Sequence, residues 1–151
     1  MALTLKPITV QRVNLNLSTE EDPEQDTWVE VRQATQKEQE LRDSLYAEQS
    51  RVYREGDAAF EIKSRYSYQE QKRMEVFLTL AGSNICYESK PGELKPLFVF
   101  KTVNGKMSLT ANEEQFKEIW GQLPASVADA IHDAVLEVNP QWNPKSTSTK
   151  S

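Results

Sequence analysis

Few side chains in this sequence are of the types that carry out catalysis. The 151 residues include a single histidine, His132, which Asp129 and Asp133 flank. An Asp–His pair can act as a general base, but no serine or cysteine is placed by a motif to act as its nucleophile, and no G-x-S-x-G sequence occurs. Four residues before and after His132 lie Ala128 and Leu136, which put it at the border of an apolar helical stripe. We therefore favour a histidine that packs or hydrogen-bonds over a catalytic base.

The single cysteine and the carboxylates give little support for metal or cofactor chemistry. Cys86 lacks the helix N-terminus or basic neighbours that activate a thiolate, so we expect a half-buried packing residue. One cysteine cannot form a disulfide within the chain, and one cysteine with one histidine cannot fill a tetrahedral zinc site. The carboxylates of residues 20–26 lack the spacing of a calcium loop, and no G-x-G-x-x-G or P-loop sequence is present. We expect no catalytic, metal or cofactor site, and we class the chain as a non-enzyme.

The charge pattern argues against nucleic acid and membrane as partners. The net charge is −5, whereas phosphate binding needs lysine and arginine in excess. Basic and aromatic residues mix in 51–54 and 63–68, but acidic residues interleave with them, which indicates a solvated, salt-bridged surface. No stretch approaches the roughly 18 apolar residues of a membrane span, and the first residues lack signal-peptide features. We expect a protein of a reducing cytoplasm.

Two stretches near the N-terminus alternate between apolar and polar residues. Residues 8–17 do so in two registers around Gln11–Arg12, which indicates a β-strand with a bulge at that point. Residues 28–32 alternate again, and the acidic, proline-containing residues 18–26 between the two stretches suit an exposed loop. The simplest arrangement is an antiparallel pair of strands with one buried face.

Two capping-box sequences predict the helices of the central part. In Thr35–Glu38 the hydroxyl and the carboxylate would satisfy backbone amides at a helix start, and Gly56 would end this helix. Ser67–Glu70 repeats the pattern and predicts a second helix that ends before Gly82. Residues 60–62 are then a short strand or a bent connector.

The first predicted helix carries many charges and only a narrow apolar stripe. The stripe and the tyrosines beside it comprise Leu41, Leu45, Val52, Tyr46 and Tyr53. Such a helix is peripheral or waits for a partner, and its apolar seam is a candidate surface for helix-in-groove binding.

A β-hairpin follows a predicted loop over residues 83–96. Asn104–Gly105 separates the apolar-containing residues 97–102 from residues 106–109. Asparagine followed by glycine is the preferred pair for a two-residue type I′ turn, because both positions need a positive φ.

The last ordered part is predicted to be helical. Thr110 and Asn112 compete as the N-cap of one helix, and Leu123–Pro124 joins it to a second that ends at Asn139–Pro140. Between residues 110 and 140 one lysine accompanies six carboxylates, so this helical hairpin carries −5, which equals the net charge of the chain. We expect its outer face to be an acidic surface.

These predictions amount to one α+β domain over residues 1–142. It combines a small antiparallel sheet and hairpins with several helices over residues 8–109, and a C-terminal helical hairpin over residues 110–142. Residues 143–151 are polar, with nothing to bury, and we expect a disordered tail. Trp142, just after the last helix, either folds back onto the hairpin or anchors a partner, and the sequence favours neither alternative.

The C-terminal module resembles the closing helical module of tail assembly chaperones from long-tailed, siphovirus-type bacteriophages. The residues that carry the likeness are Phe116, Trp120, Leu123, Pro124, Val127, Ile131, Val135, Asn139, Pro140 and Trp142. The preceding order is similar too, with residues 28–32 in a strand, then a charged helix, then a helix that ends in residues 77–81. The resemblance spans residues 8–142.

The resemblance implies a non-enzymatic protein made during virion assembly. Such chaperones bind the aggregation-prone tape measure protein, keep it soluble in the host cytoplasm while tail tube subunits polymerise around it, and are absent from the mature virion. The family often makes a longer form by ribosomal frameshifting, and the two forms would diverge after Trp142. The tail tube protein is a further expected partner, and self-association is compatible with this reading.

The candidate partner-binding residues are Leu41, Leu45, Tyr46, Val52, Tyr53 and Trp142, and the acidic hairpin would attract basic stretches of a client. The alternatives are a structural tail completion or adaptor protein and another small cytoplasmic protein-binding module. An enzyme is the least favoured class.

Overall fold

The computed structural model describes residues 2–5, 10–15, 17, 27–52 and 57–143, and of residues 45–52 and 57–67 it describes the helical backbone alone. Within these residues the strands are β1 (Val10–Leu15), β2 (Thr27–Arg32), β3 (Leu80–Ser83), β4 (Cys86–Lys90), β5 (Glu93–Pro96), β6 (Phe100–Val103) and β7 (Lys106–Leu109). The helices are α1 (Gln36–Val52), α2 (Asp57–Thr79), α3 (Glu113–Gly121) and α4 (Ala125–Val138), followed by a 3₁₀ turn at Pro140–Trp142. The fold is α+β, as the sequence predicts.

The largest sheet is antiparallel, in the order β1-β2-β3. The predicted pairing of the two N-terminal strands is confirmed, and its register runs without interruption from Val10 opposite Arg32 to Leu15 opposite Thr27. The predicted bulge at Gln11–Arg12 is therefore wrong. The irregularity lies on the other side of β2, where the pairing with β3 shifts register between Glu30 and Val31.

The first capping box is present, and it begins α1. The Glu38 amide donates to Thr35 Oγ1 (3.2 Å), and the Thr35 amide donates to Glu38 Oε1 (3.0 Å). The second capping box is wrong as a helix start, because α2 begins at Asp57 and runs through residues 60–62 and Ser67–Glu70. Once nucleated, a segment without glycine or proline propagates as a helix, so an internal capping sequence has no boundary to mark. The predicted stop at Gly56 lies outside the described residues.

The end of α2 and the residues after it also differ from the prediction. Leu80 and Ala81, expected to complete the helix, instead begin β3 (Leu80–Ser83), because pairing with β2 buries both residues. The predicted loop over residues 83–96 contains the β4–β5 hairpin, which turns at Gly92 (φ +83°). Every residue of these two strands is exposed, so the hairpin leaves no apolar alternation in the sequence from which it could be predicted.

The predicted hairpin around Asn104–Gly105 is confirmed. Asn104 (φ 53°) and Gly105 (φ 74°) both have the positive φ of a type I′ turn between β6 and β7. The first strand begins at Phe100 rather than at residue 97.

The C-terminal helical hairpin is also confirmed. Asn112, not Thr110, is the N-cap of α3, and it forms a reciprocal capping box with Gln115. Pro124 occupies the N-cap of α4, one residue earlier than its preferred place in the first turn, and Asn139 ends that helix.

The core lies where α4 crosses the three-stranded sheet. Ile131 and Val135 of α4, together with Val29, Val31 and Leu80 of the sheet, have no exposed surface. Around this centre the Phe116 ring packs against the rings of Phe77, Phe98 and Trp120, with centroids 5.4, 6.1 and 5.8 Å away. Together these contacts join α2, α3 and α4 to the sheet.

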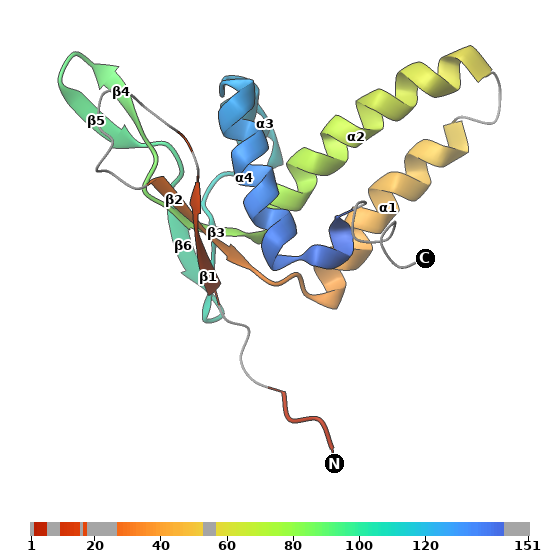
Figure 1. Ribbon diagram of the computed structural model, residues 1–151, viewed down its shortest axis with the longest axis horizontal. Coiled ribbons are helices and arrows are strands. Elements are labelled where there is room, and N and C mark those ends of the chain that lie inside the picture. The colour runs from red at the N-terminus through yellow and green to blue at the C-terminus, as the bar shows by residue number, and fades with distance from the viewer. Residues whose placement is uncertain (1, 6–9, 16, 18–26, 53–56, 144–151) are drawn as a thin grey trace.

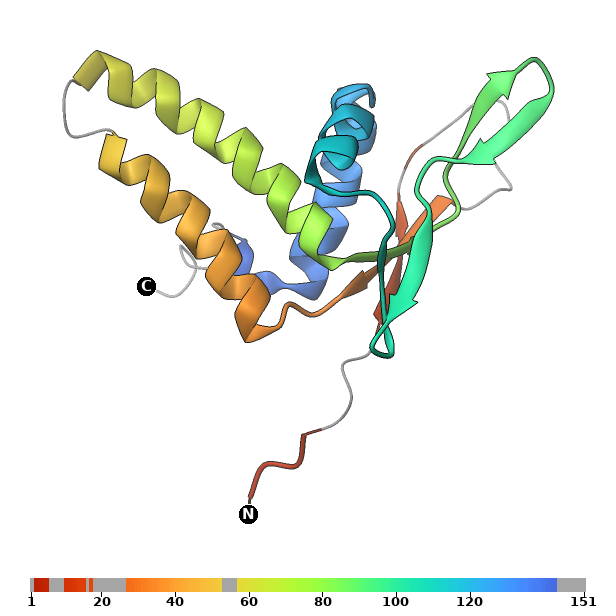
Figure 2. The same ribbon diagram turned by 180° about the vertical axis from the view of Figure 1, so that it is seen from behind.

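Two pairs of elements extend in opposite directions from this core. The helices α1 and α2 run side by side away from the sheet, and the β4–β5 hairpin leaves the sheet on the other side (Figures 1 and 2). In the described part of the chain, no helix combines the length and the apolar character that crossing a membrane requires.

The β6–β7 turn provides a test of the fold. Gly105 has open space around it, so a Gly105→Ala change meets no steric clash. It should still lower the free energy of unfolding by about 1 kcal/mol, because an L-residue is strained at positive φ. Gly121, at the end of α3, also has open space but no positive φ, so Gly121→Ala should be neutral or slightly stabilising. Urea unfolding of both variants measures the contrast, and equal effects would contradict the turn assignment.

Candidate partner-binding site

The single histidine belongs to an ionic cluster between helices. His132 on α4 is 5% exposed, and its Nε2 lies 2.6 Å from Oε1 of Glu75 on α2. The other oxygen of Glu75 accepts a hydrogen bond from Arg42 Nε on α1 (2.6 Å), and Lys72 on α2 pairs with Asp129 on α4. His132 therefore packs and hydrogen-bonds, as the sequence predicts, although its partner is Glu75 rather than a flanking aspartate. The cluster holds α1, α2 and α4 together.

Cys86 differs from its prediction. The side chain is exposed rather than half-buried, because β4 leaves the body of the protein at this residue. Its thiol lies 3.7 Å from the carbonyl oxygen of Asn84.

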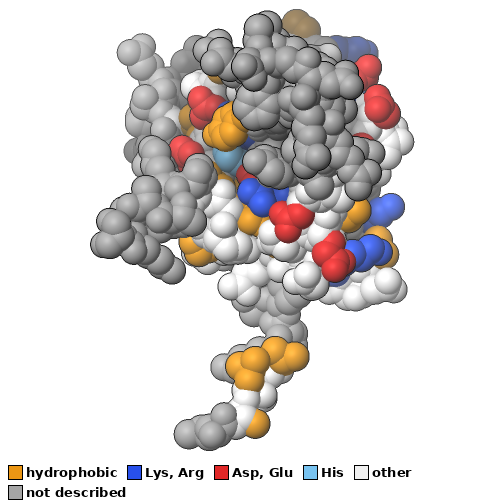
Figure 3. Space-filling model, turned by 90° about the vertical axis from the view of Figure 1, so that its right-hand side faces the viewer, with side chains coloured by type: hydrophobic (Ala, Val, Ile, Leu, Met, Phe, Trp, Pro, Cys, Tyr) orange, Lys and Arg blue, Asp and Glu red, His pale blue; other side chains and the backbone are white. Residues whose placement is uncertain are grey.

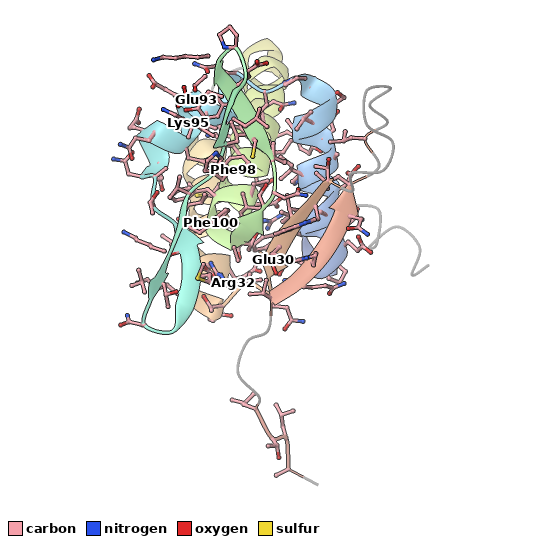
Figure 4. The ribbon with its side chains drawn as sticks, turned by 90° about the vertical axis from the view of Figure 1, so that its left-hand side faces the viewer. Glu30, Arg32, Glu93, Lys95, Phe98 and Phe100 are labelled. Carbon is pink, nitrogen blue, oxygen red and sulfur yellow. The ribbon has the colours of Figure 1, made fainter. Side chains whose placement is uncertain are left out.

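A second ionic cluster, which the sequence did not indicate, centres on Arg32 at the end of β2. Its Nη1 and Nη2 donate to the two carboxylate oxygens of Glu38 (3.3 and 3.2 Å), Nη2 also donates to the Leu78 carbonyl (2.6 Å), and Nε donates to the Met107 carbonyl (3.1 Å). Lys106 Nζ donates to Glu38 from the β6–β7 hairpin (3.0 Å). Figure 4 shows Arg32 beside this hairpin, far from Glu93 and Lys95 on β5. A hollow of about 350 Å³ opens here, but its charged groups are already paired with one another.

These contacts set the ionisation of Glu38. Burial raises the pKa of the Glu38 carboxyl, but the Thr35 amide, Arg32 and Lys106 all stabilise its charged form and together hold that pKa below its ordinary value. The charged carboxylate is therefore the form that the fold requires.

The residues after α4 attach to the same region. The buried Asn139 side chain accepts a hydrogen bond from the Ala34 amide (2.8 Å) and donates to the Arg32 carbonyl (3.1 Å). Trp142 is 3% exposed, its Nε1 donates to Gln39 Oε1 (2.7 Å), and the Arg42 guanidinium lies 5.3 Å from the centroid of its ring. Trp142 therefore folds back and is buried, but its side-chain partners lie on α1 rather than on the helical hairpin.

The predicted apolar seam on α1 is described only at its beginning. Leu41 is 47% exposed on the described part of α1. The side chains of Leu45, Tyr46 and Val52 lie outside the described residues, as does Tyr53 entirely. The seam therefore stays a prediction, and of the described candidates Leu41 is exposed whereas Trp142 is buried.

An apolar groove lies between the base of the β4–β5 hairpin and the turn that joins α3 to α4. Its volume is about 690 Å³, and it is lined by Ile85, Cys86, Tyr87, Pro96, Leu97, Val99, Ile119, Gln122, Leu123, Pro124 and Val127. None of these side chains is charged. Val99 is 53% exposed, and Tyr87 is 47% exposed, so both offer apolar area to a partner. We call this feature the hairpin groove.

The hairpin groove continues along α3. A second hollow, of about 480 Å³, shares Ile119 and Gln122 with it and includes the carboxylate of Glu118. The combined surface is apolar at the hairpin end and acidic at the α3 end. Sequence reasoning missed it because three segments that are distant along the chain form its walls, and only the exposed face of the 97–100 run gives a local signal.

The face of the molecule that Figure 3 shows carries side chains of mixed type. In Figure 3 acidic and basic side chains are interspersed on the body, and apolar side chains appear on the extended N-terminal segment, where Leu3 and Leu5 are exposed. Among the described residues, no group of three or more histidine, cysteine, aspartate or glutamate side chains is placed to hold a metal ion. Every buried side-chain nitrogen and oxygen in the same residues has a hydrogen-bond partner.

The lowered pKa of Glu38 predicts a pH dependence of stability. A carboxyl whose pKa is lower in the folded state stabilises the fold above its ordinary value, about 4.3, and this contribution is lost as the pH falls through the lower, folded value. Glu38→Gln should cost about 3 kcal/mol at pH 7, because it breaks a buried pair, and the difference from wild type should shrink below pH 4. Urea unfolding between pH 7 and pH 3 measures it. Glu40→Gln, an exposed change on the same helix, is the control, and a gap that does not narrow between pH 7 and pH 3 would contradict the assignment.

Comparison with known proteins gives no relative from which a role could be transferred. No model of a protein family, no curated protein and no solved structure matches the chain.

Proposed function

We propose that this chain is a non-enzymatic tail assembly chaperone of a long-tailed bacteriophage. It binds the tape measure protein in the host cytoplasm and keeps it soluble while tail tube subunits assemble around it. The observation that carries the proposal is the hairpin groove, a large and uncharged apolar surface, in a protein whose described buried polar groups are all paired internally. The resemblance of residues 8–142 to this family gives the binding role its setting.

The distribution of ionisable groups supports binding over catalysis. An enzyme needs a nucleophile, acid or base that faces its substrate. Here His132 and Glu75 face each other between helices, and Glu38 is enclosed by Arg32 and Lys106. Each pair joins two elements of the fold, so these groups serve the architecture.

The exposed apolar residues support a client that is itself apolar on one side. Contiguous apolar surface that faces water on a folded protein marks an interaction site. A helical client, such as a tape measure protein, would bury its apolar stripe in such a surface and would be shielded from other copies of itself. The acidic α3–α4 hairpin adds charge that keeps the complex in solution and favours basic stretches of the client.

Co-expression with the tape measure protein of the same phage tests the proposal. We expect the soluble fraction of the tape measure protein to rise several-fold when this chain is present, and the two to purify together. We also expect the chain to be absent from purified virions. Equal solubility with and without the chain would contradict the chaperone role. Stoichiometric presence in virions would identify a structural tail completion or adaptor protein instead.

The seam on α1 provides a second test of where the client binds. The double change Leu41→Ala and Leu45→Ala should leave the circular dichroism spectrum and the melting temperature unchanged, and it should strongly reduce co-purification of the tape measure protein. The matched control is Leu5→Ala, which removes the same atoms from an exposed leucine elsewhere. If the double variant and the control retain the client equally, the seam is not a binding surface.

A further inference from the structure

We infer that the hairpin groove is a docking site for an amphipathic helical segment that is apolar along one face and basic at the end that lies over Glu118. The inference rests on the proposed function only for the identity of the client. The class of ligand follows from the lining, the backbone and the charge of the groove itself.

The lining determines that the ligand is apolar. Apart from Gln122 and the Cys86 thiol, the groove presents aliphatic, proline and aromatic side chains. A charged or strongly polar ligand would lose its hydration there without gaining hydrogen-bond partners, whereas apolar side chains gain by leaving water. The volume of about 690 Å³ is within the ordinary range of ligand pockets.

The backbone of the groove favours a helix over an added strand. At the floor Cys86 is paired with Pro96 across the hairpin, and the Leu97 amide donates to the Ile85 carbonyl (2.9 Å). The Val99 carbonyl accepts from the Thr110 amide (2.9 Å). The Ile85 and Val99 carbonyls and the Leu97 amide are therefore not available to a strand laid across the floor. A helix satisfies its own backbone and contributes side chains alone, which is what this surface can bind.

The charge around the groove determines which end of the bound helix lies over α3. Glu118 lines the hollow that continues the groove along α3, and no basic side chain lines either hollow. The first turn of α3 also carries Glu113 and Glu114. A lysine or arginine at the corresponding end of the ligand would therefore be favoured, and an acidic residue there would be repelled.

A model peptide of 18 residues tests the inference without the natural client. Its leucines recur every three or four residues on one face, and its lysines occupy one terminal turn. Two control peptides have the same composition with the leucines scrambled off one face, or glutamates in place of the lysines. Fluorescence anisotropy of the labelled peptides measures affinity. Cys86 lines the groove, is exposed and is the only cysteine, so its alkylation by iodoacetamide reports occupancy in the unmodified protein.

We expect the lysine peptide to bind saturably and to slow alkylation of Cys86 at least about fivefold. Val99→Asp should weaken binding at least about tenfold, because it puts a charge against the apolar face. The matched control is Val103→Asp, which changes a similarly exposed valine (44% against 53%) outside the groove. Should Val99→Asp unfold the protein, Tyr87→Asp replaces it, with Tyr68→Asp on α2 as its control.

The charge of the α3 end is tested separately. Glu118→Lys should weaken binding of the lysine peptide about two- to fivefold, as expected for an exposed pair, and should strengthen binding of the glutamate peptide. Glu137→Lys makes the same change at an exposed position on α4 and should alter neither affinity. Equal effects of the two variants would overturn the direction assigned to the ligand.

Failure of this inference can be told apart from failure of the proposed function. If Val99→Asp and Val103→Asp bind the peptide equally, if the scrambled peptide binds as well, or if Cys86 is not protected, the groove is not a helix-docking site. If both variants keep the tape measure protein soluble, the chaperone role stands and the groove assignment falls. If the wild type binds the peptide in the groove but does not solubilise the tape measure protein, the groove stands and the chaperone role falls. A dimer in sedimentation equilibrium that Val99→Asp dissociates would assign the groove to a second copy and overturn the client assignment.

Discussion

A buried carboxylate, that of Glu38, is the constraint on which the arrangement of the elements depends. A glutamate that is 6% exposed is tolerated only if other groups compensate its charge. The compensation comes from three directions, because Thr35 caps the same helix, Arg32 approaches from β2 and Lys106 from the β6–β7 hairpin. Arg32 also donates to the carbonyl of Leu78, near the end of α2, and to the carbonyl of Met107 on β7. One ionised group therefore fixes the start of α1 relative to the sheet, to the end of α2 and to a hairpin more than 60 residues away along the chain.

The other polar contacts extend this arrangement outward along the helices. Glu75 joins α1 to α4 through Arg42 and His132, and the Trp142 ring lies over the first turns of α1 through Gln39. Charged pairs are thus concentrated between the helices, where removing one partner leaves the other buried and uncompensated. An apolar surface faces water at the opposite end, in the hairpin groove, where no charged side chain competes with a ligand. The buried ionisable pairs thus hold the fold together, whereas recognition is assigned to exposed side chains of the groove and of α3.

How much of this could be predicted from the sequence depended on how local each signal was. The Thr35–Glu38 box and the Asn104–Gly105 turn are confirmed because their hydrogen bonds and dihedral angles involve neighbours in the chain. The Ser67–Glu70 box carries the same local information but lies inside α2, where only the length of the helix shows that nothing begins there. Residues 86–96 form a hairpin with no buried face, so periodicity could not reveal it. The hairpin groove depends on a loop, a hairpin base and a helix turn that meet only in three dimensions. The sequence predicted α3 and α4, which form one side of the groove, but it did not indicate that they lie opposite the base of the β4–β5 hairpin.

The composition of the groove has a consequence for the kind of binding that it supports. Hydrogen-bonded sites discriminate strongly because a mismatched ligand leaves buried polar groups unpaired, whereas an apolar site distinguishes ligands by little more than shape and area. A surface lined almost entirely by aliphatic and aromatic side chains therefore accepts many apolar helical sequences with similar affinity, and the Glu118 end contributes orientation rather than identity. A long client that repeats an amphipathic pattern would offer such a site many equivalent segments. Each contact would be weak and exchangeable, and under the proposed chaperone role such contacts would let the client pass to polymerising subunits by displacement of one contact at a time.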